Sequence, residues 1–287
     1  MRSLLFVPAH DSRKCDKALV SGADALILDL EDAVPPLEKA AARRCCADFV
    51  TRHRAHARLF VRINALSSGE ALADLDAVVA AAPHGLMLPK CERGADVARL
   101  GALIGEREGR AAPLRILPIV TETAASLFHL GSYATEAGPR LCGLFWGGED
   151  LAADIGAKAN RDDQGRYTAP YRMARALTLL GATAARVPAY DAVYTDFCDP
   201  AGLRTEADEA ERDGFSGKVA IHPDQIAVLH AAFTPTEAEV AHARRVVAAF
   251  DAQPSAGALA LDGRMLDRPH ERAARRLLAR VGDGTAP

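Results

Sequence analysis

Short apolar runs alternate with amphipathic segments along most of the chain. Eight of these runs have the length of a β-strand: 3–8, 24–31, 58–64, 85–90, 114–122, 141–147, 191–197 and 217–223. Their apolar residues mostly follow one another instead of occupying alternate positions. This pattern predicts strands that are buried on both faces, as in a parallel sheet.

Between the apolar runs lie helical patterns, such as 12–22, 36–50, 71–82 and 170–184. Eight strands that alternate with helices are typical of a (β/α)8 TIM barrel, whose usual size is about 250 residues. A doubly wound open sheet is the alternative. That fold normally carries a glycine-rich phosphate turn after its first strand, and residues 6–14 contain no glycine. We therefore expect an α/β protein built on a TIM barrel.

The chain continues beyond the eighth predicted strand. Further helical patterns cover 224–233 and 235–253, a turn-rich segment follows at 255–269, and residues 270–282 form a basic amphipathic helix pattern. We place the barrel catalytic domain at residues 1–250 and a C-terminal helical extension or lid at 251–287. Because the extension is too short for a second domain, we expect it to fold over the barrel or to reach a neighbouring subunit.

The composition excludes several classes of protein. The 287 residues are 49% hydrophobic and 25% charged, and the net charge is −3, so no basic excess favours nucleic acid or an anionic membrane surface. No apolar segment approaches the length of a membrane span, and the first one is too short for a signal peptide. The six cysteines lack zinc-like spacing. We expect reduced thiols in a cytoplasmic protein.

Two acidic clusters stand where buried strands end. Glu122 closes the fifth strand, and Glu149 and Asp150 follow the sixth. A carboxylate at such a position is costly to desolvate unless a cation or a donor compensates it. One strand–helix unit separates the clusters, so both can converge on one hard metal ion, Mg²⁺ or Mn²⁺. The alternative is a salt bridge from these carboxylates to Arg62 or Lys90.

Polar residues also follow most of the other predicted strands. They are Asp29, Glu31, Asp32, Arg62, Asn64, Lys90, Asp196 and His222. Since catalytic groups of TIM barrels gather at the carboxyl ends of the strands, we expect these side chains to converge. Arg62 is suited either to a bidentate clamp on a substrate carboxylate or to a counter-ion role beside Asp29 or Glu31. Asp29 and Asp32 either hydrogen-bond metal-bound water or cap the turn into the next helix.

The remaining candidates differ in what their chemistry offers. Gly147 and Gly148 are expected to present free backbone N–H groups to an anionic substrate, with a helix beginning at Asp150 behind them. Glu149 either contacts the substrate or supports the residues that do. Lys90 lies among carboxylates that keep it protonated, which disfavours a Schiff-base role. His222 is interpreted as a packed residue at the barrel end and not as a base.

At this point the chain resembles the citrate-lyase-β-subunit-like proteins of the aldolase/citrate lyase superfamily of acyl-CoA lyases. The resemblance runs nearly end to end, through LLFVPA, ADALILDLEDAV, FVRIN, LMLPK, IVTETA, WGGEDLAADIG, DAVYTDFCDPAGL, GKVAIHPDQI and DGRMLD. It implies a (β/α)8 barrel, typically trimeric, that binds Mg²⁺ and acts on CoA thioesters of hydroxy-diacids. It also implies that Glu122 and Asp150 are the metal ligands and that Arg62 holds the carboxylated substrate.

The resemblance gives the C-terminal extension a role as well. It implies that Asp267, in GRMLD, is the catalytic acid/base and is commonly supplied by a neighbouring subunit. We add Glu31 to this catalytic group. One departure concerns the turn after the first strand, where Ala9, His10 and Asp11 replace a Gly-Asp-Arg type of sequence. Arg13 and Lys14 are the expected contacts to the CoA phosphates, and a different grip or a different acyl carrier remains open.

These observations favour a Mg²⁺-dependent carbon–carbon lyase. It would cleave a citryl-, citramalyl- or malyl-type CoA thioester into acetyl-CoA, or another acyl-CoA, and a 2-keto acid, and it would act as a homotrimer. Three alternatives remain: a malyl-CoA-type thioesterase that uses the same site, a small aldolase that forms pyruvate enolate without CoA, and a β-subunit of a larger citrate lyase complex that depends on an acyl carrier protein.

Overall fold

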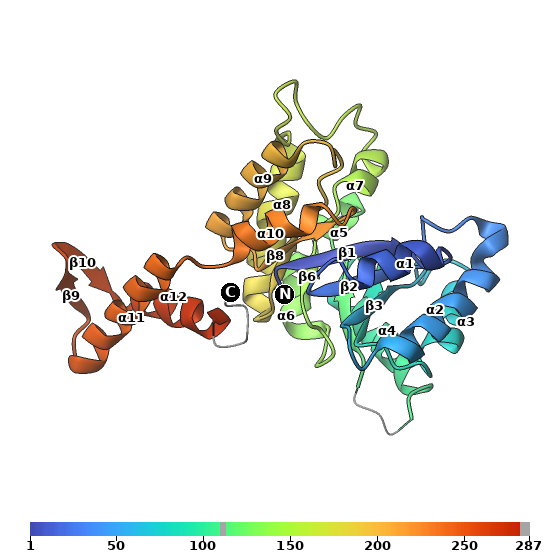
Figure 1. The fold of residues 1–287 in the computed structure, drawn as a ribbon, viewed down its shortest axis with the longest axis horizontal. Coiled ribbons are helices and arrows are strands. Elements are labelled where there is room, and N and C mark those ends of the chain that lie inside the picture. Colours follow the sequence, from blue (N-terminus) through green and yellow to red (C-terminus); the bar gives the residue numbers. More distant parts are fainter. Residues whose placement is uncertain (110–112, 282–287) are drawn as a thin grey trace.

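A barrel of eight parallel strands forms the centre of the computed structural model, which describes residues 1–109 and 113–281. The strands are β1 (Ser3–Pro8), β2 (Ala25–Asp29), β3 (Leu59–Arg62), β4 (Gly85–Leu88), β5 (Arg115–Pro118), β6 (Leu144–Phe145), β7 (Ala189–Asp191) and β8 (Gly217–Ala220). Their spatial order is β5-β4-β3-β2-β1-β8-β7-β6 (Figure 1). This order follows the sequence around a ring, as the predicted TIM barrel requires.

The ring closes between β5 and β6 through isolated contacts. Parallel bridges join Ile116 to Leu141 and Ile119 to Phe145, and the N–H of Val120 donates to the carbonyl of Phe145 over 2.9 Å. The closure is less regular than the other pairings because β6 has two residues only. The TIM-barrel prediction is confirmed, with a barrel that is nearly closed.

Apolar side chains fill both sides of the strands, which explains the continuous apolar runs of the sequence. Inward-facing positions such as Leu4, Ile27 and Phe60 belong to a cluster inside the barrel. Their neighbours in the sequence, such as Leu5 and Leu28, belong to a larger cluster that includes helix residues. Successive strand residues face opposite sides, so both sides are dry and the helices cover the outer one.

The helices lie between the strands and after them. They are α1 (Ser12–Leu19), α2 (Lys39–His53), α3 (Ala71–Val78), α4 (Gly94–Gly105), α5 (Ala124–Leu127), α6 (Tyr133–Glu136), α7 (Glu149–Asp154), α8 (Ala169–Ala185), α9 (Pro200–Asp213), α10 (Gln225–Phe233), α11 (Glu237–Ala252) and α12 (Arg268–Arg280), with short 3-10 helices η1 (Pro36–Glu38) and η2 (Leu130–Ser132). No helix of the described residues is long and apolar enough to cross a membrane. All six cysteines are free thiols.

The seventh strand was predicted wrongly. We predicted a strand at 191–197, whereas β7 spans Ala189–Asp191. Asp196 therefore lies in the following loop and not at a strand end. Asp196 is exposed and accepts a hydrogen bond from the N–H of Cys198. The cause is Asp191, which looks like the polar start of a strand but is fully buried at the end of one.

Asp191 is the centre of a buried ionic network. It accepts hydrogen bonds from the Trp146 indole (2.6 Å), from Arg175 (2.9 Å) and from Lys218 (2.9 Å). Lys218 is fully buried too, and it also donates to Glu206 over 2.6 Å. The network joins β7 and β8 to α8 and α9, because its members come from all four elements.

Replacing Lys218 with methionine should strongly destabilise the fold. The ammonium group of Lys218 lies between Asp191 and Glu206, and its loss leaves buried negative charge that Arg175 and Arg161 compensate only in part. Removing one partner of a buried ion pair typically costs about 3–5 kcal/mol. Urea unfolding of Lys218→Met should show this loss, whereas the exposed Lys158→Met should stay within about 0.5 kcal/mol of wild type. Equal stability of the two variants would contradict the structural role of the network.

The C-terminal extension has a core of its own. The turn-rich segment at 255–269 contains an antiparallel hairpin of β9 (Ala258–Leu261) and β10 (Arg264–Asp267). Apolar residues of α11, the hairpin and α12 form one cluster. The hairpin lies far from the barrel at one end of the molecule (Figure 1). The domain boundary at residue 250 stays a prediction, and residues 282–287 of the predicted extension lie outside the described residues.

Candidate active site

A cleft of about 460 Å³ opens at the carboxyl ends of the strands. Eight of the residues singled out in the sequence line it: Asp29, Asp32, Arg62, Glu122, Gly147, Gly148, Glu149 and Asp150. The rest of the wall is mainly apolar and includes Phe6, Ile119 and Phe145. A concave apolar site with a few convergent polar groups is the usual form of a ligand site.

Glu122 is a buried carboxylate held by the backbone of Lys90. Only 4% of Glu122 is exposed, and its Oε2 accepts a hydrogen bond from the N–H of Lys90. Lys90 has a left-handed backbone with φ of 50°, a conformation that costs residues other than glycine roughly 1–3 kcal/mol. Burial raises the pKa of Glu122 to about 8, and the charges of Asp150 and Glu31 add to the increase. The carboxylate therefore lacks sufficient positive charge around it.

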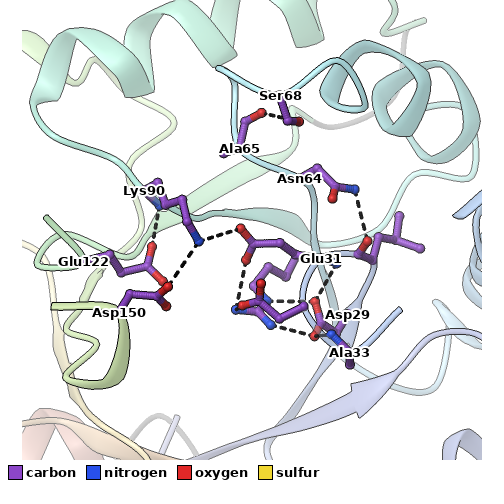
Figure 2. A network of polar contacts seen from close by, with 12 residues as sticks. Asp29, Glu31, Ala33, Asn64, Ala65, Ser68, Lys90, Glu122 and Asp150 are labelled. Carbon is purple, nitrogen blue, oxygen red and sulfur yellow. Dashed lines mark hydrogen bonds and ion pairs between the residues drawn. The ribbon is translucent and has the colours of Figure 1, made fainter. Parts of the chain in front are cut away.

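The side chain of Lys90 connects the acidic groups of the cleft. Its Nζ lies 3.0 Å from Glu31 Oε1 and 3.4 Å from Asp150 Oδ1 (Figure 2). Burial alone would lower the pKa of Lys90, but Glu122, Glu31 and Asp150 outweigh it and raise the pKa above its ordinary value. A protonated amine cannot attack a carbonyl, so this charge disfavours a Schiff-base role for Lys90. The alternative of a salt bridge from Asp150 to Lys90 is present in this structure.

Arg62 is engaged by three acidic residues. Its Nε and Nη2 donate to the two oxygens of Asp29 at 2.7 and 2.6 Å, and its Nη1 lies 3.0 Å from Glu31 and 3.2 Å from Asp32. These contacts match the counter-ion interpretation. The arginine still lines the cleft, and Phe6 lies under its guanidinium at 4.9 Å. Asp29 also accepts from the N–H groups of Glu31 and Ala33, so it caps the turn after β2 (Figure 2).

Gly147 contributes space instead of a free donor. The N–H of Gly147 donates to Thr121 Oγ1 over 3.0 Å, so the prediction that it is free was wrong. A Cβ at Gly147 would lie 3.2 Å from Ile119 and 3.4 Å from Cγ of Glu122, so glycine keeps this wall of the cleft open. The helix α7 begins at Glu149 instead of Asp150 and has only six residues. Glu149 is exposed and accepts from Asn160 over 2.8 Å.

Several predicted residues lie outside the cleft. Arg13 and Lys14 are exposed in the first turn of α1, directly after β1, and Lys14 lies 3.5 Å from Asp11. His222 stacks on Phe197 and lies 3.5 Å from Asp224, and its side chain is 42% exposed. Asp267 is the last residue of β10 and the N-cap of α12, and His270 Nδ1 lies 2.5 Å from its Oδ1. The hydrogen bond from His270 lowers the pKa of Asp267.

Sequence reasoning missed the support behind the cleft. Asn64 does not enter the cleft: its amide nitrogen donates to Asp74, and its oxygen accepts from Lys39 over 2.8 Å. Lys39 also donates to the carbonyls of Leu30 and Glu31, so this network fixes the backbone that carries Glu31. Asp74 lies on a helix, and nothing in the sequence indicates that it anchors Asn64. Its complete burial was the missing information.

The fold and the cleft are typical of TIM-barrel enzymes. Two carboxylates, a lysine and an arginine lie together at the carboxyl ends of the strands. Comparison with known proteins agrees. Residues 2–223 match the model of the HpcH/HpaI aldolase/citrate lyase family. The chain belongs to this family, which confirms the resemblance drawn from the sequence motifs.

Three relatives cover most of the chain. A crystal structure of CitE from Mycobacterium tuberculosis in complex with magnesium, acetoacetate and coenzyme A is 36% identical, covers 98% of both chains and has a TM-score of 0.81. The mitochondrial citramalyl-CoA lyase of Rattus norvegicus is 36% identical over 93% of this chain and 82% of its own length. A (3S)-malyl-CoA thioesterase of Cereibacter sphaeroides is 34% identical over 98% of this chain and 94% of its own length.

Proposed function

We propose that this protein is a Mg²⁺-dependent carbon–carbon lyase for a citryl-, citramalyl- or malyl-type CoA thioester. The observation that carries the proposal is the convergence of Glu122 and Asp150 on Lys90, in a cleft that Arg62 also lines. The similarity to a citramalyl-CoA lyase and to a CitE structure that contains magnesium and coenzyme A supports the same assignment.

The two carboxylates fit a magnesium ion. Among the described residues, no group of three or more His, Cys, Asp or Glu side chains is arranged to hold a metal. Mg²⁺ does not need such a cage, because it keeps several waters and is usually bound by one or two carboxylates plus the substrate. The raised pKa of Glu122 marks a shortage of positive charge that a divalent cation would supply. Glu122 and Asp150 would hold the ion, and Mn²⁺ satisfies the same oxygen ligands. When bound, the metal supplies Lewis-acid polarisation of a substrate oxygen.

The other residues of the cleft would position the substrate. Arg62 would hold the carboxylate of the keto-acid half, for which its planar guanidinium is suited. Glu31 contacts both Arg62 and Lys90, so it fixes these two cations relative to each other. Gly147 and Gly148 would admit the substrate beside Glu149, and Arg13 and Lys14, exposed after β1, would contact the CoA phosphates.

Cleavage requires one proton to leave an oxygen and one to reach a carbon. The hydroxyl of the substrate gives its proton to water and becomes the carbonyl of the 2-keto acid. The electron pair of the broken carbon–carbon bond moves to the carbon next to the thioester, and that carbon takes a proton to become acetyl-CoA. We assign this proton donation to Asp267, which would first take up a proton from water and would act as base in the reverse condensation.

Asp267 would have to come from another copy of the chain. The hairpin that carries it lies away from the barrel, at the far end of the molecule (Figure 1). Its carboxylate is 42% exposed and faces no residue of the chain's own cleft among its described contacts. We therefore propose a homo-oligomer, and the family resemblance favours a trimer.

Incubation with Mg²⁺ and a panel of citryl-, citramalyl- and malyl-CoA, followed by mass spectrometry, tests the function. Acetyl-CoA plus a 2-keto acid, lost on chelation of the metal, is the expected result. Free CoA plus an intact hydroxy acid would replace the lyase by a thioesterase, the activity named for the Cereibacter sphaeroides relative. Turnover of none of these esters would overturn autonomous activity and favour a subunit that needs an acyl carrier protein.

A further inference from the structure

A second cavity, of about 800 Å³, lies at the opposite end of the barrel. Its wall includes Arg2, Asp24, Arg58 and His84, each of which stands directly before a strand, β1 to β4 in turn. The cavity is therefore at the amino ends of the strands, whereas Glu122 and Arg62 are at or beyond the carboxyl ends. We refer to it as the basal cavity.

Positive charge in the basal cavity is not neutralised by the protein. Arg54 and Arg58 are exposed and line it, and neither forms an ion pair with an acidic side chain within the described residues. Asp24 is the acidic residue of the wall, and its carboxylate already has partners within the chain. It lies 3.1 Å from Arg2 and 3.3 Å from Nε2 of His230. Two arginines therefore remain available for a negatively charged ligand.

A tyrosine from the barrel interior also reaches this cavity. Only 2% of Tyr190 is exposed, and its ring belongs to the apolar cluster inside the barrel. Tyr190 nevertheless lines the basal cavity, and its hydroxyl has no hydrogen-bond partner in the part of the chain that the structure describes. The hydroxyl is not among the buried side-chain atoms that lack a partner, so it is accessible from the cavity and can donate into it. An acceptor from outside the chain would satisfy it.

His84 offers a donor of defined position. Its Nδ1 accepts a hydrogen bond from the N–H of Leu59 over 3.3 Å. Burial and the neighbouring Arg58 both lower the pKa of His84, so the ring is neutral at pH 7 and its single proton resides on Nε2. The ring can then donate to a ligand without carrying a charge of its own.

We propose that the basal cavity binds a phosphate group, with Arg58 supplying the charge and His84 and Tyr190 supplying neutral donors. Three donors on separate elements suit a phosphate, which offers more acceptor oxygens than a carboxylate. Hydrogen bonds from an arginine to a phosphate are charge-assisted and roughly twice as strong as neutral ones. Free phosphate and the phosphate of a nucleotide share this chemistry.

Isothermal titration with inorganic phosphate, at constant ionic strength and without Mg²⁺, tests the site. Wild-type protein should bind phosphate saturably. Arg58→Gln and Tyr190→Phe should each weaken binding about tenfold, since a hydrogen bond to a charged group contributes about 1.4 kcal/mol or more. Arg58→Lys should recover part of the loss, and Arg99→Gln, an exposed arginine on α4, should bind like wild type. Tyr190→Phe keeps the ring that packs the barrel, so its fold is preserved.

The outcomes separate this site from the catalytic cleft and identify the source of the phosphate. Tighter binding of AMP than of phosphate, lost in the same variants, would assign the site to a nucleotide, and equal binding would assign it to free phosphate. Unchanged binding in Arg58→Gln and Tyr190→Phe would place the anion elsewhere and overturn the proposal. The same holds if wild type shows no saturable binding, or if Arg99→Gln loses as much affinity as Arg58→Gln.

Discussion

The Asp150→Asn variant should lose Mg²⁺ binding and at least about a thousandfold in turnover, while it folds normally. The metal's Lewis-acid contribution amounts to several kcal/mol, and each 1.36 kcal/mol changes the rate tenfold. Asp150 is 39% exposed and contacts Lys90 at 3.4 Å, so its replacement leaves no buried charge without a partner. Calorimetric titration with Mg²⁺ and a product assay by mass spectrometry measure both effects.

Asp163→Asn provides the matched control for Asp150→Asn. Asp163 is exposed and lies outside the cleft, so this variant removes the same charge without touching the proposed ligands. It should keep both Mg²⁺ affinity and turnover. If Asp150→Asn behaved like Asp163→Asn, the metal would have to be held elsewhere, and the assignment of Glu122 and Asp150 would fail.

The Asp267→Asn variant should lose about a hundredfold to ten-thousandfold in turnover and keep its affinity for Mg²⁺. Those magnitudes are the usual contribution of a positioned general acid or base. Asparagine is as good a helix N-cap as aspartate, so α12 should keep its start at this residue. A fall in kcat with unchanged metal binding would separate proton transfer from the metal site.

Asp262→Asn, in the turn of the same hairpin, is the control for Asp267→Asn. Asp262 has a left-handed backbone with φ of 51°, which asparagine tolerates. Near wild-type turnover of Asp262→Asn would show that the hairpin remains folded. Full activity of Asp267→Asn would remove this residue from the mechanism, and equal losses in both variants would point to a positional effect of the hairpin.

The hydrophobic pattern predicted the barrel because parallel strands are buried on both faces and give continuous apolar runs. It located β1 with the observed bounds and placed most of the other strands within a few residues. It failed at β7, where the decisive residue is charged. Asp191 is fully buried because Lys218 and Arg175 meet it from other elements. Such partners are distant in the sequence, and no local pattern reveals them.

The candidate site was predictable to a similar degree. The rule that polar groups gather after barrel strands brought Glu122, Asp150, Arg62 and Lys90 together correctly. It could not predict that the N–H of Gly147 donates to Thr121. It also could not predict that the backbone N–H of Lys90 donates to Glu122. Both facts depend on loop conformation. Asp267 was identified through the family resemblance alone, since nothing in its local sequence marks it as reactive.

The separate core of α11, the hairpin and α12 bears on how activity depends on protein concentration. Because this unit keeps its shape through its own packing, Asp267 has a fixed place relative to α12 but not to the cleft it would serve. If that cleft belongs to another copy, a complete catalytic centre exists only in the assembled oligomer. Specific activity would then fall on dilution while every chain stays folded and able to bind its metal, so dissociation alone would switch off turnover.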